Sequence, residues 1–172
     1  MCKCPQLIEL HLPGSGHLSS AALVLILERL PTLEVLGLRG CERVTTGLAS
    51  IAANTALYTR LRQLELSHCS LAIDEDVSRL LSKLPSLRVL DADFCSLLTD
   101  AVLESLPPSL EALSVLGCLR MSFDRLQEVE GTLGPKLKSD DTAVLSCLRG
   151  KNIGPSLVEM LLNYRQEECR RC

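Results

Sequence analysis

The stretch LRVLDADFCSLLTD at residues 87–100 shows most completely the unit from which the chain is built. It has leucine at its first and fourth positions, an apolar residue at its sixth, cysteine at its ninth, an apolar residue at its twelfth and then a Thr-Asp pair. The leucine pattern recurs, and the five units begin at Leu7, Leu33, Leu61, Leu87 and Leu110. Their starts are 26, 28, 26 and 23 residues apart, a spacing that indicates an array of stacked structural repeats.

The composition agrees with such an array and excludes several classes of protein. Leucine accounts for 38 of the 172 residues, apolar residues for 47% and charged residues for 23%, and the net charge is −3. This apolar content excludes a disordered chain, and no uncharged apolar run of about 18 residues predicts a membrane span. The slightly acidic balance and an aromatic content of 2% argue against a nucleic-acid surface. We therefore expect a folded protein that binds neither nucleic acid nor membrane.

The later positions of each unit predict a turn and then a helix. The ninth positions are Ser15, Cys41, Cys69, Cys95 and Cys118, and the twelfth are Leu18, Val44, Leu98 and Met121, with Ile73 one place later in unit three. Residues that cap helices follow at Ser19, Thr45, Asp74, Thr99 and Ser122, since their side-chain oxygens can accept from a first helical turn. Behind each cap lies an apolar set at helical spacing. One unit is therefore a strand, a turn, a capped helix and a return loop.

Alternation along each strand decides which side chains face inward. Residues two apart in a strand share a face, so we expect the fourth and sixth positions to point into the core. These are Leu10 and Leu12, Leu36 and Leu38, Leu64 and Leu66, Leu90 and Ala92, and Leu113 and Val115. One unit cannot bury its strand and helix faces alone, whereas stacked units can. The expected fold is an α/β right-handed solenoid with a parallel sheet on its concave side and helices on its convex side.

The expected organisation has three parts. Residues 1–130 hold the five clear units, and residues 131–141, rich in glycine, proline and charge, form an inserted loop. Residues 142–172 hold a degenerate sixth unit and a C-terminal capping helix that starts near Pro155. The alternative for this last part is a short helix capped by Ser139 that runs through Leu148.

The pattern resembles the cysteine-containing leucine-rich repeat of F-box proteins and their relatives, within the ribonuclease-inhibitor-like superfamily. Residues 61–69 and 87–100 match it best, and Cys4-Pro5-Gln6-Leu7 resembles the junction between two such units. The resemblance implies a protein-binding scaffold or adaptor, and in its narrower form the substrate-recognition module of a ubiquitin-ligase-type assembly. The cysteines at the ninth position, read as buried thiols, imply a reducing compartment and therefore a cytoplasmic or nuclear protein. No F-box pattern precedes the first unit.

The nine cysteines have two readings. Those at the ninth position predict a ladder of buried thiols, typical of a reducing compartment. Cys2 and Cys4, and Cys169 and Cys172, leave open a zinc- or redox-dependent dimer, because neither pair supplies the four ligands of a zinc site. No histidine is placed to activate a cysteine nucleophile. We expect no enzymatic activity, no catalytic residues, no metal site and no cofactor.

Partner binding is expected on the sheet face that carries the third, fifth and seventh positions. This face has an acidic centre with apolar flanks, which favours a protein partner with a basic and apolar surface. The residues expected to bind it are His11, Arg39, Gln63, Glu65, Val89, Asp91, Asp93, Phe94 and Leu116.

The first unit supports a second hypothesis. Its strand begins almost at once, at Leu7, so its edge and inner face lack a polar covering. We expect another chain or segment to cover this end. On this alternative the protein is a structural or regulatory subunit of a larger complex, held through its first repeat.

Overall fold

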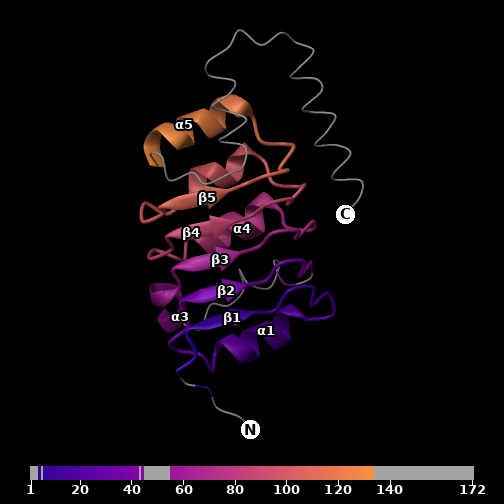
Figure 1. The fold of residues 1–172 in the computed structure, drawn as a ribbon, viewed down its shortest axis with the longest axis vertical. Helices are drawn as coiled ribbons and strands as arrows, with labels where there is room; N and C mark the ends of the chain where they lie inside the picture. Colours follow the sequence, from indigo (N-terminus) through magenta and orange to yellow (C-terminus); the bar gives the residue numbers. More distant parts are fainter. Residues whose placement is uncertain (1–3, 5, 43, 45–54, 134–172) are drawn as a thin grey trace.

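The computed structural model describes residue 4, residues 6–42, residue 44 and residues 55–133. Its centre is a parallel sheet with the order β1-β2-β3-β4-β5. The strands are β1 (Glu9–His11), β2 (Val35–Gly37), β3 (Gln63–Glu65), β4 (Val89–Asp91) and β5 (Ala112–Ser114). Figure 1 shows them side by side in chain order. The five predicted units are therefore consecutive rungs of one array.

The register of the sheet matches the sequence alignment position by position. The third residues of the units, Glu9, Val35, Gln63, Val89 and Ala112, are partners across successive strands. The fourth and fifth residues are aligned in the same way. Equivalent side chains thus form straight rows about one strand spacing apart, roughly 4.8 Å.

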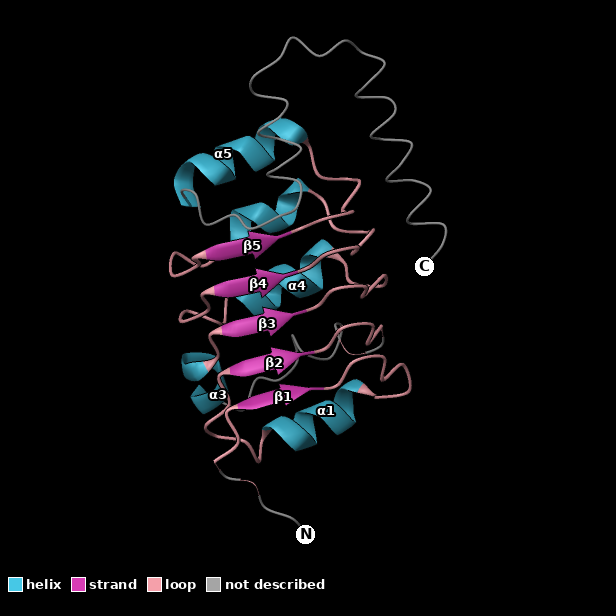
Figure 2. Ribbon diagram, viewed as in Figure 1, coloured by secondary structure: helices cyan, strands magenta, loops and turns pink. Residues whose placement is uncertain are grey.

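Helical segments connect the strands and pack on one side of the sheet, as Figure 2 shows for α4 behind β3 and β4. They are α1 (Ser20–Leu27), α3 (Thr55–Arg60), α4 (Asp74–Leu81), the 3-10 helix η1 (Asp100–Ser105) and α5 (Phe123–Leu133). Unit four has a 3-10 helix where the sequence predicts an ordinary one. None of the helices within the described ranges is both long enough and apolar enough to cross a bilayer.

The core consists of the rows that the alternation predicts. From unit two to unit five, every residue at the fourth and sixth positions is buried, with leucine in most places. Leu10 and Leu12 of unit one are only partly buried, because β1 has a neighbouring strand on one side only in the described part of the sheet. Burying a leucine side chain contributes about 1.5–3 kcal/mol, so these rows supply much of the stability.

A ladder of buried thiols joins successive units. Each ninth-position cysteine donates from its Sγ atom to the carbonyl oxygen of the sixth residue in the unit before it. The pairs are Cys41 to Leu12 (2.9 Å), Cys69 to Leu38 (3.3 Å), Cys95 to Leu66 (3.2 Å) and Cys118 to Ala92 (3.1 Å). The carbonyl oxygens of Leu38, Leu66 and Ala92 also accept from the backbone amide three residues further along their own unit, so each thiol adds a second donor that links one unit to the next. The predicted ladder is confirmed for the four described cysteines at this position.

The helix caps are confirmed in three units and corrected in one. Ser19 Oγ accepts from the Ala22 amide, Thr99 Oγ1 from that of Ala101 and Ser122 Oγ from that of Arg125. In unit three the expectation was wrong, because α4 begins at Asp74 and its N-cap is Ile73, with no side-chain cap bond. Ile73 is also not the buried twelfth residue, since it is 42% exposed and Ala72 is fully buried instead.

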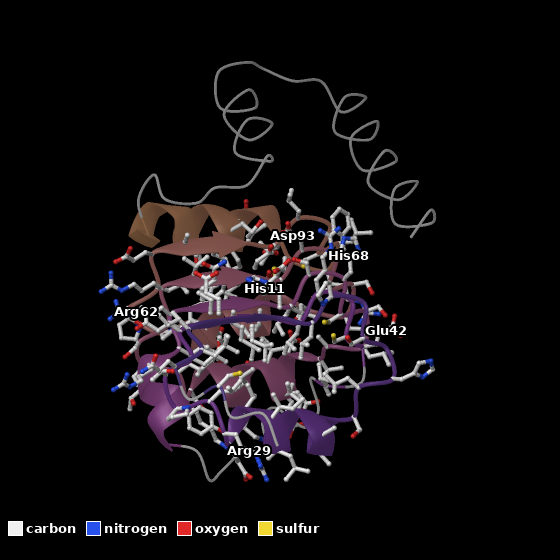
Figure 3. The ribbon with its side chains drawn as sticks, turned by 60° about the horizontal axis from the view of Figure 1, so that its bottom comes forward. His11, Arg29, Glu42, Arg62, His68 and Asp93 are labelled. Atoms are coloured by element: carbon white, nitrogen blue, oxygen red, sulfur yellow. The ribbon has the colours of Figure 1, made fainter. Side chains whose placement is uncertain are left out.

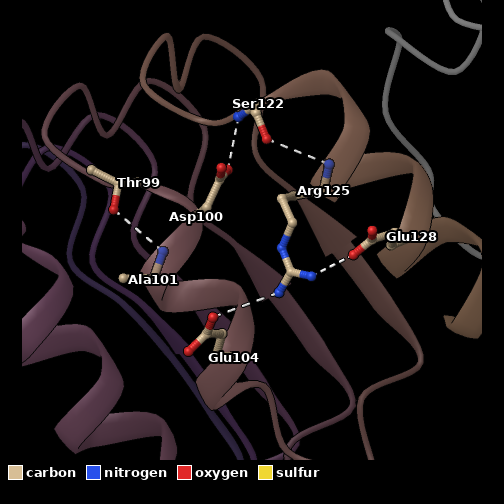
Figure 4. Close-up of polar contacts among 7 residues, drawn as sticks. All are labelled: Thr99, Asp100, Ala101, Glu104, Ser122, Arg125 and Glu128. Carbon is tan, nitrogen blue, oxygen red and sulfur yellow. Dashed lines mark hydrogen bonds and ion pairs between the residues drawn. The ribbon is translucent and has the colours of Figure 1, made fainter.

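Asp74 and Asp100 bond to the following unit instead. Asp74 accepts from the amide and hydroxyl of Thr99, at 2.8 and 2.6 Å. Asp100 Oδ1 accepts from the Ser122 amide at 2.7 Å, as Figure 4 shows. In the same view the guanidinium of Arg125 lies between Glu104 of η1 and Glu128 of α5. Polar side chains thus fasten the helix starts of units three, four and five together.

Several expectations lie at or beyond the limits of the described residues. Helix α5 runs to Leu133, so it includes residues 131–133, which the sequence analysis assigned to the inserted loop. The rest of that loop, the sixth unit, the capping helix, Thr45 and Cys2, Cys169 and Cys172 lie outside the described residues.

Candidate partner-binding surface

The side of the sheet opposite the core carries the predicted binding residues. We call it the open sheet face and define it by the third, fifth, seventh and eighth positions of each unit. Figure 3 places His11, His68 and Asp93 on this side and Arg29 on the other, near the helices. His11 and Arg39 are exposed, while the other predicted residues are half-buried: Gln63, Glu65, Val89, Asp91, Asp93, Phe94 and Leu116.

Two expected surface positions are buried. Gly37, the fifth residue of unit two, leaves a gap that its neighbours fill. A Cβ atom there would lie 2.3 Å from His11 Nδ1 and 3.1 Å from Glu65 Oε2. The imidazole and the carboxylate therefore meet across the glycine, at 3.7 Å between Nδ1 and Oε2. Ser67, the seventh residue of unit three, is also buried and donates to Asp91.

The acidic centre expected from the sequence is Glu65, Asp91 and Asp93. Asp91 ends β4 and Asp93 follows two residues later. Asp91 Oδ1 accepts from the Ser67 hydroxyl at 2.6 Å and from the Asp93 amide at 3.1 Å. Asp93 Oδ1 accepts from the Ser114 hydroxyl and the Leu116 amide, both at 2.7 Å. Among the described residues, only the Oδ1 atom of each carboxylate accepts hydrogen bonds. The sheet thus holds the two side chains in place through their Oδ1 atoms.

The surroundings of Asp93 oppose its negative charge. Burial is the main cause that raises the pKa of this carboxyl above its usual value, and the neighbouring charge of Asp91 acts in the same direction. The hydrogen bonds from Ser114 and Leu116 and the proximity of His68 act against these causes. A positive group placed beside the two aspartates would therefore stabilise their charged forms.

The eighth position forms the turn at the end of every strand and has a left-handed backbone in all five units. Gly14, Gly40 and Gly117 occupy it in three units, with φ of 66°, 68° and 68°. His68 and Phe94 occupy it in units three and four, with φ of 61° and 57°. This conformation costs a residue with a Cβ atom about 1–2 kcal/mol. His68 and Phe94 therefore stand where the backbone prefers glycine.

Hydrogen bonds explain why the backbone keeps this conformation. The amide of each described eighth residue from unit one to unit four donates to the carbonyl oxygen of the seventh residue in the next unit. For His68 the acceptor is Asp93, at 2.7 Å, and for Phe94 it is Leu116, at 2.5 Å. The left-handed turn is thus common to all the units, whichever side chain occupies the eighth position.

His68 and Phe94 stack on each other and lie in a row with Arg39. Their ring centroids lie 4.7 Å apart and the ring planes differ by 18°. Arg39 lies at one end, with its guanidinium nitrogen 3.3 Å from His68 Nε2. Gly117 lies at the other end, where an added Cβ atom would be 2.5 Å from Phe94 Cδ1. Side chains of units two, three and four therefore form one continuous edge beside the two aspartates.

The thiols near this surface are protected rather than reactive. Burial raises the pKa of Cys69 to about 11, and it also raises the pKa of Cys95 and Cys41. A thiol is nucleophilic or binds metal only when it is deprotonated. In the described part of the chain, no three His, Cys, Asp or Glu side chains gather closely enough to hold a metal ion.

Comparisons with known proteins find similarity of fold. No family model matches the sequence, and no curated protein matches it. Among solved structures, a chain in the crystal structure of the Rad7 and Elc1 complex in yeast superposes with a TM-score of 0.60 and 22% identity. The match covers 79% of this chain and 33% of that one, so the present chain spans about a third of its length.

A second similar structure is the leucine-rich repeat-containing protein LegL7 from Legionella pneumophila. Its TM-score is 0.42 at 15% identity, over 76% of this chain and 54% of that one. With its leucine rows, parallel strands and helices on one side, the protein has a leucine-rich-repeat-like α/β fold.

His68 is not among the residues predicted to bind a partner, yet it lies on the candidate surface beside Phe94. The neighbouring residue Cys69 is buried and donates to Leu38. The signal was present in the alignment, because the eighth position reads Gly, Gly, His, Phe, Gly along the five units. A change from glycine to a large ring at a turn position marks a side chain that the turn itself does not require.

Proposed function

We propose that the protein is a non-enzymatic scaffold or adaptor that binds a protein partner through its open sheet face. The observation that carries the proposal is the row of Arg39, His68 and Phe94 beside the Asp91–Asp93 pair. This row gathers planar and charged side chains from successive units on one surface. Aromatic residues and arginine are the side chains that contribute most to protein interfaces.

The arrangement of the sheet supports binding of a macromolecule over binding of a small molecule. The strands expose parallel rows of side chains that extend across all five units. Core leucines hold these rows from beneath, so the surface is preorganised and loses little freedom on binding. Repeat proteins use such extended faces as binding surfaces.

The narrower proposal concerns the type of assembly. The cysteine ladder, the leucine rows and the capped helices fit a right-handed solenoid of the cysteine-containing type. We propose that the protein acts, like the arrays of F-box proteins that its sequence resembles, as the substrate-recognition module of a ubiquitin-ligase-type assembly. The similar yeast structure is itself a complex of two proteins. A ladder of thiols supports a cytoplasmic or nuclear location.

Site-specific photo-crosslinking tests the open sheet face. A benzophenone amino acid is placed at Gln63 or Val89 on the sheet and, as matched controls, at Arg79 or Glu104 on the helices. All four side chains reach the surface at least in part. In the native cell we expect one protein to be captured from both sheet positions and from neither helix position. Capture of the same protein mainly from the helix positions would contradict the proposal.

A second candidate role rests on exposed apolar side chains of unit one. Ile8, Leu25 and Ile26 are 53%, 58% and 37% exposed, and they lie at the end of the array that β1 forms. These residues fit the hypothesis of a structural subunit that is held through its first repeat. Substituting Leu25 and Ile26 with glutamate would then abolish assembly, whereas changes on the open sheet face would leave it intact. Measurement of complex mass by light scattering separates the two roles.

A further inference from the structure

On the part of the open sheet face that units three to five form, negative charge and apolar surface meet. We call it the acidic strip and define it as Glu65, Asp91, Asp93, Phe94 and Leu116. Glu65 and Asp91 are register partners on β3 and β4. Asp93 follows two residues after Asp91 and therefore lies on the same face. Its bond to the Leu116 amide links it to unit five, so the strip crosses units three, four and five.

The basic residues near the strip already have partners. Arg39 contacts the His68 ring at 3.3 Å, and His11 lies against Glu65. No lysine or arginine within the described ranges forms an ion pair with Asp91 or Asp93. Their Oδ1 atoms accept from hydroxyl and amide groups of the sheet, and no residue in the described part of the chain donates to either Oδ2 atom. Asp91 and Asp93 therefore hold their carboxylates in fixed positions with no lysine or arginine partner among the described residues.

Apolar side chains border this charge on two sides. Val89 precedes Asp91 on the same face of β4, and Phe94 and Leu116 lie beyond Asp93. All three are half-buried, so each presents part of its surface to a ligand. The sheet beneath them is closed by the buried leucines of β3, β4 and β5. A ligand that fits must place a positive group between two apolar ones.

We propose that the acidic strip binds an extended segment of a protein partner in which a lysine or arginine is flanked by apolar residues. This inference rests on the proposed function and names the chemistry of its partner. The positive group lies between the Oδ2 atoms of Asp91 and Asp93, and the apolar residues pack on Val89 and on Phe94 and Leu116. Charge complementarity selects the occupant, since a nucleic acid would bring phosphates against two carboxylates.

Binding of short synthetic peptides tests the proposal on the purified full chain. The probe is a fluorescent, end-capped peptide of alternating leucine and lysine. One control peptide has glutamate in place of lysine, and another has serine in place of leucine. By fluorescence anisotropy we expect the leucine–lysine peptide to bind about tenfold more tightly than either control, and its affinity to fall as salt is raised. Equal binding of the glutamate peptide would overturn the proposal.

Matched variants locate the site. Asp91→Asn with Asp93→Asn removes both charges but keeps oxygen atoms that can accept from Ser67, Ser114 and the amides. We expect this double variant to bind the peptide about tenfold more weakly. The control, Glu75→Gln with Glu104→Gln, removes the same charge from exposed helix positions and should bind within about twofold of the parent. Equal effects of the two double variants would overturn the proposal.

Three further experiments keep the result unambiguous. Carbodiimide coupling joins lysine amines to nearby carboxylates, and mass spectrometry should find the peptide on Asp91 or Asp93. If the double variant does not fold, Phe94→Gly replaces it, because glycine is the residue of three other units at this turn, and it should also weaken binding. Displacement of the peptide by micromolar calcium would instead identify a cation site and overturn the proposal.

The photo-crosslinking experiment distinguishes failure of the protein-binding role from failure of the proposed basic segment. A partner captured from Gln63 and Val89 but insensitive to Asp91→Asn with Asp93→Asn would keep the protein-binding role and reject the basic segment. Capture from the helix positions only would reject the protein-binding role itself.

Discussion

Two neighbouring positions of the repeat, the ninth and the eighth, are used in opposite ways. The ninth position holds four buried cysteines, Cys41, Cys69, Cys95 and Cys118. Each donates to the carbonyl oxygen of the sixth residue in the unit before it. At the eighth, all five residues share a left-handed backbone, but three are glycine and two are His68 and Phe94.

The contrast shows where a repeat protein keeps its fold and where it can vary. A buried position meets the same neighbours in every unit, so the same side chain recurs there. A turn position needs only the backbone conformation, and a side chain added there points to the surface. Differences between units at such positions are therefore the first place to look for binding residues.

The largest expected effect on stability comes from truncating a buried leucine of the core rows. Leu64→Ala should lower the free energy of unfolding by about 3 kcal/mol, because Leu64 is 1% exposed at the centre of the sheet. Urea unfolding followed by circular dichroism measures this change. Gln63→Ala on the opposite face is the control and should change stability by less than about 0.5 kcal/mol. Similar effects at both positions would break the assignment of inner and outer faces.

Gly117→Ala should have the next largest effect, about 2 kcal/mol. Alanine would have to adopt the φ of 68°, which is unfavourable for a residue with a Cβ atom. Its Cβ atom would also lie 2.5 Å from Phe94 Cδ1. Gly14→Ala is the control, since φ is similar there, at 66°. An added Cβ atom at Gly14 would have no described atom within 4 Å other than those of its chain neighbours. This variant should lower the free energy of unfolding by about 1 kcal/mol. The same urea titrations compare the two. Equal costs would show that Phe94 does not lie against Gly117.

Alkaline pH should weaken the ladder of buried thiols. Folding raises the pKa of Cys69 from 9.0 to about 11, so the unfolded chain loses its proton first as the pH rises. The contribution of Cys69 to stability is complete below the pKa of the thiol in the unfolded chain and is lost as the pH rises above it. Between pH 8 and pH 10 the free energy of unfolding should fall by about 1 kcal/mol because of Cys69. Urea unfolding with reductant present at each pH measures it. In a Cys69→Ala variant, the free energy of unfolding should depend less on pH. If its pH dependence equals that of the parent protein, groups other than Cys69 cause the loss of stability.

The smallest effect concerns the strained turn of unit four. Phe94→Gly and Phe94→Ala both remove the ring from its stack with His68, but only alanine keeps a Cβ atom at a φ of 57°. The glycine variant should therefore be the more stable of the two by about 1 kcal/mol. Thermal unfolding of the two variants gives the difference. If alanine were the more stable residue, the turn of unit four would differ from those with glycine.

Much of the fold follows from local patterns. The spacing of Leu61, Leu64 and Leu66 and of their equivalents predicts strands, their inner faces and their order, because a parallel array is the arrangement that buries every leucine row at once. The same spacing places Asp91, Asp93 and Leu116 together on the open sheet face. What it does not predict is the contact between two units. Asp74 has the chemistry of a cap, but it bonds to Thr99 of the next unit instead.

The repeat can be predicted from the chain alone, because the strand and helix periods and the ninth-position cysteines follow from residue spacing. The contacts that side chains make between units depend on the three-dimensional packing. It brought His68 onto Phe94, joined His11 to Glu65 across Gly37 and fixed Asp91 and Asp93 through bonds to Ser67 and Ser114. These contacts join residues more than twenty positions apart in the chain, and their distances depend on how neighbouring units stack, which no local pattern encodes.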